Sequence, residues 1–187
     1  MRQPPPSQKS VTDEQREKLL AASPAWLRFA IQLYADHGLR FTSALKVKPK
    51  DFNYETGILM VETKGGYQQA IPVTKTIRHY IETLPERASA EETIVEILAG
   101  KKITTDGVRK AFRRCRREAG IPEDVNPHNF RRAIATKAWK ETKDIRVVQQ
   151  ILGHHSMHTT ARYIVDEEPE KLRELLEELK PHSARVQ

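Results

Sequence analysis

Apolar residues recur at helical spacing along most of the chain, and the first long stretch of this kind predicts the beginning of a core. A helical pattern starts at Thr12 with acidic and amide residues suited to a helix start. It continues as two helices with broad apolar faces, separated at Pro24, and the second ends near His37-Gly38. Arg40 follows directly. We expect these two helices to build much of the core.

The period of the pattern shortens between residues 45 and 73, where short apolar runs alternate with turn residues. A short helix over Thr76 to Leu84 and a polar connection follow, and residues 93–98 fit either a strand or a helical turn. The fold class expected is α+β, mainly α-helical with a small three-stranded antiparallel sheet. The three predicted strands are Leu45 to Val47, Ile58 to Thr63 and Ala70 to Val73.

A strongly amphipathic segment then predicts a helix from a cap at Thr105 to about Glu118. Its apolar side includes Val108, Phe112 and Cys115. Two readings of the other side are open: a solvated helix face, or a surface that contacts phosphates. That side carries Arg109, Lys110, Arg113, Arg114, Arg116 and Arg117.

Asn126-Pro127 is a strong helix start, because asparagine caps free N–H groups and proline fits the first helical position. His128 and Arg131 are three residues apart and share a face of the first turns, where the helix dipole favours an anion. The apolar stripe of this helix is Phe130, Ala133, Ile134 and Ala138. A second helix is expected from a cap at Asp144 to a stop at Gly153, with Ile145, Val148, Ile151 and Leu152 on its buried face.

The pattern His128-x-x-Arg131, Leu152-Gly153-His154, Thr159-Thr160 and Tyr163 resembles the catalytic end of the tyrosine recombinases, the phage integrase family. Upstream, GLRFTSALKV at 38–47 is similar to the first-arginine box of that family, and ETKGG at 62–66 is similar to its lysine turn. The boxes span residues 38–163 in the order of the family. The resemblance implies the tyrosine recombinase catalytic-domain fold, which breaks and rejoins DNA.

The resemblance also implies a mechanism through a 3′-phosphotyrosyl intermediate that needs no ATP, metal or other cofactor. Two arginines would hold the non-bridging phosphate oxygens, since guanidinium suits phosphate geometry. A histidine would add a hydrogen bond, a lysine would protonate the leaving 5′ oxygen, and a second histidine would take the proton of the tyrosine nucleophile. The two arginines are Arg40 and Arg131, and the hydrogen-bonding histidine is His154. The lysine is Lys64, the histidine that takes the proton is His128, and the nucleophile is Tyr163.

One residue departs from the pattern of the family. Three residues after the first arginine the family usually carries a carboxylate, whereas this chain has Ser43. A serine hydroxyl takes part in hydrogen bonds but does not counter the charge of Arg40. Another group must do that work, or the enzyme is slower.

Composition is compatible with this reading. The 187-residue chain has a formal charge of +7 and a pI near 9.5, which fits a partner rich in phosphate and equally fits other basic proteins. Cys115 is the only cysteine, no run reaches the roughly 20 apolar residues of a membrane span, and no signal core is present. We expect a cytoplasmic, nucleoid-associated protein that binds double-stranded DNA through Arg109, Lys110, Arg113, Arg114, Arg117 and Arg132.

The chain divides into three parts by composition. Residues 1–11 are a flexible linker or chain end, residues 12–165 are the catalytic domain, and residues 166–187 form an acidic amphipathic helix and tail. Recombinases of this family add a smaller N-terminal DNA-binding domain and work as tetramers on DNA. That domain is absent from this chain, so we expect weak, salt-sensitive DNA binding from the segment alone.

Two other functions compete with this one. The first is a DNA-binding protein on the same fold whose catalysis has decayed, favoured only by Ser43. The second is a type IB topoisomerase, which shares the phosphotyrosyl chemistry. Each matched residue taken singly also has an ordinary structural explanation, and a metal site at His154 and His158 lacks a clear third ligand. The DNA site, the biological role and the use of Tyr163 in cis or in trans are not encoded in these motifs.

Overall fold

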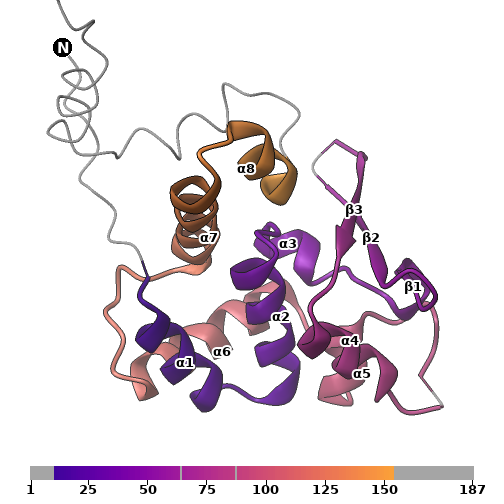
Figure 1. Ribbon diagram of the computed structural model, residues 1–187. Helices are drawn as coiled ribbons and strands as arrows, with labels where there is room; N and C mark the ends of the chain where they lie inside the picture. Colours follow the sequence, from indigo (N-terminus) through magenta and orange to yellow (C-terminus); the bar gives the residue numbers. More distant parts are fainter. Residues whose placement is uncertain (1–10, 64, 87, 154–187) are drawn as a thin grey trace, which may run out of the picture.

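The computed structural model describes residues 11–63, 65–86 and 88–153 of the chain, and it has a mostly helical body with one small sheet (Figure 1). The expected α+β class is therefore confirmed. The described elements are α1 (Asp13–Ala22), α2 (Ala25–Asp36), α3 (Phe41–Ala44), the 3-10 helix η1 (Pro49–Asp51), β1 (Phe52–Asn53), β2 (Ile58–Glu62), β3 (Gln68–Pro72), α4 (Lys75–Glu82), α5 (Ile94–Ala99), α6 (Thr105–Glu118), α7 (Pro127–Thr142) and α8 (Ile145–Leu152).

The helix α2 is the centre of the core. Leucine, isoleucine and aromatic side chains around its whole circumference are fully buried, as expected for a helix enclosed by others. It contacts α3, α4, α5, α6 and α7. The ring of Tyr34 on α2 meets the ring of Phe130 on α7 at a centroid distance of 5.8 Å. The first helical turns of α7, which carry His128 and Arg131, are therefore fixed directly to the core.

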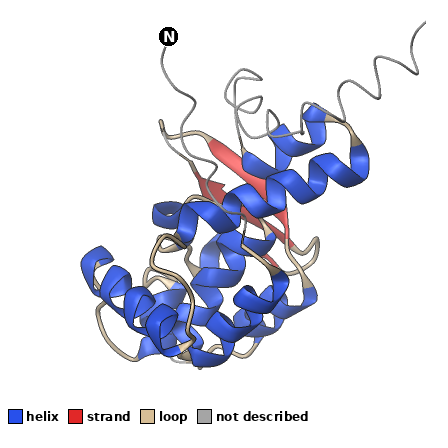
Figure 2. Cartoon of the chain, turned by 90° about the vertical axis from the view of Figure 1, so that its left-hand side faces the viewer, coloured by secondary structure: helices blue, strands red, loops and turns tan. Residues whose placement is uncertain are grey.

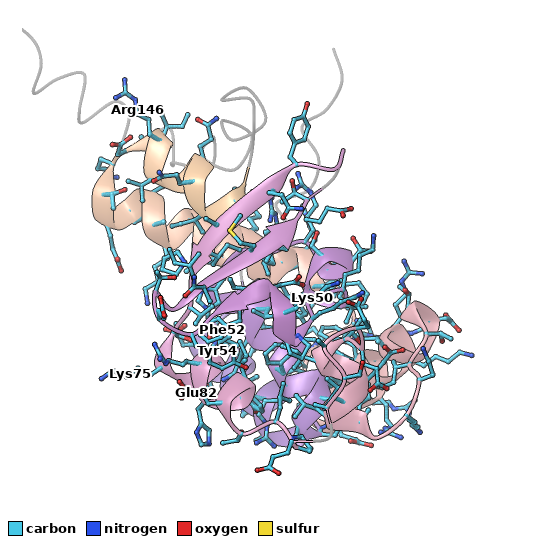
Figure 3. All side chains as sticks on the ribbon, turned by 90° about the vertical axis from the view of Figure 1, so that its right-hand side faces the viewer. Lys50, Phe52, Tyr54, Lys75, Glu82 and Arg146 are labelled. Atoms are coloured by element: carbon cyan, nitrogen blue, oxygen red, sulfur yellow. The ribbon has the colours of Figure 1, made fainter. Side chains whose placement is uncertain are left out.

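The three strands form an antiparallel sheet in the order β1-β2-β3. Leu59 on β2 faces Ile71 on β3, and both are buried, whereas the next residue on β2, Met60, is exposed, so the sheet has one core face. At the outer edge the rings of Phe52 and Tyr54 meet edge to face at 4.9 Å (Figure 3). Figure 2 shows the strands in red beside the helical body.

The prediction of a strand at Leu45 to Val47 is wrong. Val47 is buried, and its carbonyl oxygen accepts a hydrogen bond from the N–H of Ile94 at 2.8 Å, so this backbone joins α5 instead of the sheet. The first strand is Phe52–Asn53, which pairs with the start of β2. The open choice at residues 93–98 is settled as helix, because Thr93 caps it with a capping box and Gly100 ends it in a left-handed conformation.

The helices that carry the expected site begin and end where the caps predict. Asn126 accepts a hydrogen bond from the N–H of His128 at the start of α7, and Asp144 does the same for Arg146 at the start of α8. Gly153 ends α8 with φ +56°. For α6 the cap is Thr104, one residue earlier than predicted.

The far ends of α7 and α8 form a second, small apolar cluster apart from the main core. Its buried members are Ala135, Ala138, Val148 and Leu152. Ala133 and Ile134, predicted to be part of the buried stripe, are only partly buried. Within the described residues, no helix is long and apolar enough to cross a membrane.

Candidate active site

Arg131 lies at a junction where several distant segments of the chain meet. Its side chain is buried, with 4% of the residue exposed. Nη1 donates to the carbonyl oxygen of Gly38, and Nη2 donates to the carbonyl oxygen of Leu152 at 2.5 Å. A buried cation needs such acceptors, because an unsatisfied buried charge is costly. One guanidinium thus fixes α7 against the end of α8 and against the segment that leads to Arg40.

Gly38 brings that segment close to α8. It has φ +64°, a conformation that residues with a side chain rarely adopt, and an added Cβ would lie 3.1 Å from the carbonyl oxygen of Ile151. Two residues later, Arg40 stands at the start of α3 with a half-buried side chain. Among the described residues, no hydrogen bond or ion pair involves the Arg40 guanidinium. Arg40 therefore follows, by two residues, the carbonyl that Arg131 holds.

His128 lies one helical turn before Arg131, on the first turn of α7. Its side chain is exposed, but partial desolvation of the ring lowers the pKa of His128 below its ordinary value, and the positive charges of Arg131 and Arg132 lower it further. The neutral imidazole is consequently favoured near neutral pH. A neutral imidazole is the form that accepts a proton as a general base.

Ser43, which replaces the usual carboxylate, is buried on α3. Its hydroxyl donates to the carbonyl oxygen of Glu62 at 3.0 Å, at the end of β2. In this chain the position thus ties the first-arginine segment to the β2–β3 hairpin through a neutral hydrogen bond.

Three of the six predicted catalytic residues lie outside the described residues: Lys64, His154 and Tyr163. By sequence, Lys64 directly follows Thr63 in the β2–β3 connection, and His154 directly follows Gly153. The described residues that precede them lie next to the junction. Thr63 and Gly153 line one hollow of about 630 Å³ between β3 and α8.

The predicted DNA-binding residues of α6 are exposed, and they form a basic face apart from the junction. Arg109, Arg113 and Arg117 make no ion pair with any described residue, whereas Lys110 pairs with Asp106 and Arg114 with Glu118. Arg116 was expected on this face and is not: its Nη1 donates to the carbonyl oxygens of Glu123 and Val125, and so it holds the loop before α7. Arg132 lies on α7 and is partly buried.

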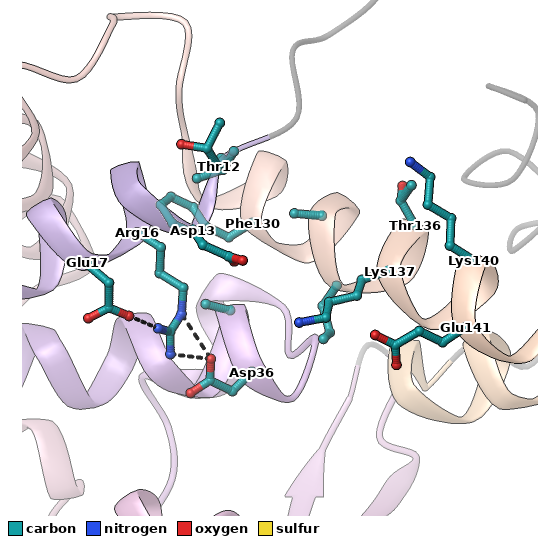
Figure 4. A pocket seen from close by; sticks show the side chains of 14 residues that line it. Thr12, Asp13, Arg16, Glu17, Asp36, Phe130, Thr136, Lys137, Lys140 and Glu141 are labelled. Atoms are coloured by element: carbon teal, nitrogen blue, oxygen red, sulfur yellow. Dashed lines mark hydrogen bonds and ion pairs between the residues drawn. The ribbon is translucent and has the colours of Figure 1, made fainter. Parts of the chain in front are cut away.

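A further hollow lies away from the junction. A groove of about 700 Å³ runs between the start of α1, the end of α2 and the outer side of α7, and includes Phe130 and Lys137 but neither Arg40 nor Arg131 (Figure 4). Beside it Arg16 donates to Asp36 at 2.6 Å. Among the described residues, no group of three or more His, Cys, Asp or Glu side chains is placed to hold a metal ion.

Sequence reasoning missed Gln69. This β3 residue donates from Nε2 to the carbonyl oxygen of Gln150 at 2.8 Å, and so it joins the sheet to the end of α8. Figure 1 shows α8 and the β2–β3 hairpin on the same side of the molecule. No motif marks the residue, because its partner lies 81 positions away along the chain.

Comparisons with known proteins agree with this architecture. The model of the phage integrase family matches residues 9–170. Tyrosine recombinase XerC of Chlamydia pneumoniae is 29% identical over 142 residues, 73% of this chain and 46% of the Chlamydia protein, and XerC of Rhizobium meliloti is 28% identical over 175 residues, 87% of this chain and 55% of its own length. This chain spans about half the length of these curated relatives.

Solved structures have the same fold. The catalytic core of lambda integrase superposes with a TM-score of 0.62 at 27% identity, over 78% of this chain and 91% of that chain. The XerA recombinase superposes with a TM-score of 0.72 at 23% identity, over 96% of this chain and 68% of that chain, a likeness of fold alone. The fold is that of a tyrosine recombinase catalytic domain, and the chain belongs to the phage integrase family.

Proposed function

We propose that this chain is the catalytic part of a tyrosine-type site-specific DNA recombinase, and that residues 12–165 form its catalytic domain. The observation that carries the proposal is the junction at which buried Arg131 bridges the carbonyls of Gly38 and Leu152. It gathers segments that contain or directly precede Arg40, His128 and His154. A site that combined these two arginines and two histidines would suit a phosphate.

The proposed reaction exchanges one phosphoester bond for another. The Tyr163 oxygen attacks the scissile phosphorus, and His128, whose lowered pKa keeps it neutral, takes the tyrosine proton. Arg40, Arg131 and His154 stabilise the charge on the non-bridging oxygens. Lys64 gives a proton to the departing 5′ oxygen. Attack by a 5′ hydroxyl of another strand on the 3′-phosphotyrosyl link then restores the phosphodiester and frees Tyr163.

Ser43 does not argue for decayed catalysis in this arrangement. Its hydroxyl keeps a defined partner, the carbonyl oxygen of Glu62, and so the position retains a role between α3 and the β2–β3 hairpin. Its lack of charge leaves the Arg40 guanidinium without a carboxylate three residues away. We therefore propose an active enzyme, and the decayed DNA-binding protein is kept only as the outcome that the trapping test below would have to show.

The partner we propose is double-stranded DNA, with assembly as a tetramer in the full-length protein. Two relatives support this: a lambda integrase tetramer bound to a Holliday junction, 25% identical over 83% of this chain and 47% of that chain, and XerH bound to difH substrate, whose likeness at 23% identity is one of fold. Residues 166–187 are the proposed subunit-linking helix, and the proposed location is the cytoplasm, in association with the nucleoid.

The test of the chemistry is covalent trapping. The protein is mixed with a library of duplexes that carry a nick beside a candidate cleavage position and randomised flanks, and adducts that resist denaturant are recovered and sequenced. We expect adducts with the wild type and none with Tyr163→Phe. If the wild-type protein binds the duplexes in a filter-binding assay yet forms no adduct, a DNA-binding protein with decayed catalysis becomes the better explanation.

The basic face of α6 has its own test. In a variant with Arg109, Arg113 and Arg117 changed to Gln, we expect weaker DNA binding. The slope of log affinity against log salt should be smaller by roughly one for each DNA phosphate that an arginine no longer neutralises. The matched control changes Lys18 on α1, Lys75 on α4 and Lys137 on α7, all of them exposed, to Gln. An equal change of slope in both variants would show that α6 contributes only general positive charge.

A further inference from the structure

The C-terminus of α8 is held by side chains from two distant elements. The last carbonyls of a helix have no partner within it and must be satisfied from elsewhere. Nε2 of Gln69 donates to the carbonyl oxygens of Gln150 at 2.8 Å and of Ile151 at 3.4 Å, and Arg131 donates to that of Leu152 at 2.5 Å. Three successive carbonyls at the end of α8 are thus bound from β3 and from α7.

The Gln69 contact crosses a gap that apolar side chains do not fill. Gln69 and Gln150 both line two hollows, one of about 630 Å³ and one of about 350 Å³. Gln69 pairs with Val61, next to the last pair of the β2–β3 ladder before the connection, and the N–H of Thr63 donates to the carbonyl oxygen of Tyr67 at 2.7 Å just beyond the ladder. A shift of Gln69 therefore moves the whole hairpin.

Gly153 is matched to this contact. It has φ +56°, and an added Cβ would overlap the side-chain amide of Gln69. A glycine there serves two purposes: it ends α8 in a left-handed conformation, and it leaves room for the amide to reach the helix end.

From these contacts we infer that Gln69 is a positioning residue, which fixes the β2–β3 hairpin against the end of α8 and thereby sets the hairpin relative to Arg131. The inference rests on the proposed function, in which Lys64 belongs to the connection of this hairpin and His154 follows Gly153. Gln69 touches no reacting atom. It acts by holding the hairpin, whose connection supplies the leaving-group acid, against the end of α8, which Arg131 fixes independently.

The test compares Gln69→Leu with Gln68→Leu, because Gln68 is the exposed neighbour on the same strand and its side chain is on the other face. The readout is the single-turnover rate of adduct formation at saturating nicked duplex, measured beside the DNA dissociation constant. A misplacement of about 1 Å costs up to about 100-fold in rate, so we expect Gln69→Leu to slow adduct formation by roughly 10- to 100-fold at unchanged affinity. Gln68→Leu should match the wild type.

Two further arms separate positioning from general damage. A duplex with sulfur in place of the bridging 5′ oxygen has a leaving group that needs no proton, and on it Gln69→Leu should approach the wild-type rate. Gln69→Arg restores a donor toward the α8 carbonyls and has room in the adjoining hollows, so it should recover most of the activity on the ordinary duplex.

The outcomes are distinct. An equal loss by Gln69→Leu on both duplexes, or an activity like that of the wild type on the ordinary duplex, overturns the positioning role while the proposed function stands. Absence of any wild-type adduct overturns the proposed function, and the positioning role with it. Amide hydrogen exchange of the protein without DNA checks the contact itself. Gln69→Leu should raise the exchange rates in residues 58–72 and 146–153, and unchanged rates there would show that Gln69 does not hold the hairpin against α8.

Discussion

The main core and the α7–α8 end of this molecule are stabilised in different ways. The main core buries large side chains from α1 to α6, from the sheet and from the start of α7, and α2 is enclosed on all sides. The α7–α8 end buries only Ala135, Ala138, Val148 and Leu152 in a separate cluster, two of which are alanines. Besides the packing of Phe130 at the start of α7 in the main core, hydrogen bonds from Arg131 and Gln69 to backbone carbonyls join this end to the rest.

This difference explains where the candidate site lies. Apolar packing is non-directional and tolerates small shifts, whereas a guanidinium bound to two carbonyls defines a position. The core supplies a fixed base for Arg40 and for the start of α7, and the polar junction sets the other segments against it. Regions with few buried apolar contacts open at lower free energy than the core, so we expect the α7–α8 end to adjust more readily than the core when the proposed DNA partner binds.

The largest expected effect comes from equal truncations in the two regions. Leu27 on α2 and Leu152 on α8 are both fully buried. We expect Leu27→Ala to lower the free energy of global unfolding by about 2–5 kcal/mol, because the full core surrounds the lost atoms. Leu152→Ala should lower it less and should raise amide exchange selectively in α8. Equal shifts of the urea midpoint, without local exchange, would show that the two regions are one cooperative unit.

A smaller effect tests the close approach at the junction. Gly120 and Gly153 both have positive φ, but an added Cβ meets nothing within 4 Å at Gly120 and overlaps Gln69 at Gly153. Gly120→Ala should cost about 1–2 kcal/mol for backbone strain alone, and Gly153→Ala should cost more. In a Gln69→Ala background that excess should disappear. Urea unfolding of the wild type, of Gly120→Ala, Gly153→Ala and Gln69→Ala, and of the Gln69→Ala, Gly153→Ala double variant would measure it. If Gly153→Ala remains more destabilising than Gly120→Ala in that background, the extra cost does not come from overlap with Gln69.

The smallest effect concerns pH. His37 is buried at the end of α2, accepts a hydrogen bond from the N–H of Thr74 at 3.5 Å, and has its pKa lowered mainly by burial, against a smaller opposing effect of Asp36. As pH falls through about 6.5, the histidine is protonated in the unfolded chain before it is protonated in the folded one. The free energy of unfolding therefore decreases until the lower pKa of the folded state is reached. The lowered pKa of His128 changes the free energy of unfolding in the same direction.

We expect wild-type stability to fall between pH 7.5 and 5.5, and His37→Gln to lose part of that dependence in thermal melts at several pH values. His79→Gln, on the exposed side of α4, is the control and should keep the dependence. A wild-type profile that is flat over this range would contradict the buried, neutral state of His37.

Features encoded by neighbouring residues could be predicted from sequence. The caps at Asn126 and Asp144, the stop at Gly153 and the shared face of His128 and Arg131 all depend on residues within a few positions of one another, and the structure confirms each. Membership of the phage integrase family could also be predicted, because the sequence motifs of the family are short local strings in a fixed order.

Features that depend on distant partners could not be predicted. Val47 leaves the sheet because its carbonyl bonds to Ile94, and Arg116 leaves the basic face because it bonds to the loop before α7. The spacing from His128 and the family resemblance predict a phosphate role for Arg131, but neither predicts its hydrogen bonds to the carbonyls of Gly38 and Leu152. The junction is made of such long-range contacts.

The most direct test of the central claim, that this junction grips a scissile phosphate, uses Arg40, whose removal breaks no hydrogen bond or ion pair among the described residues. Adduct formation by the wild type and by Arg40→Ala is timed on nicked duplexes with an ordinary scissile phosphate and with each methylphosphonate diastereomer, which lacks one charged oxygen. We predict a loss of at least about 100-fold on the phosphate and a much smaller loss on a methylphosphonate. Equal losses on both, or no loss on either, would contradict the account.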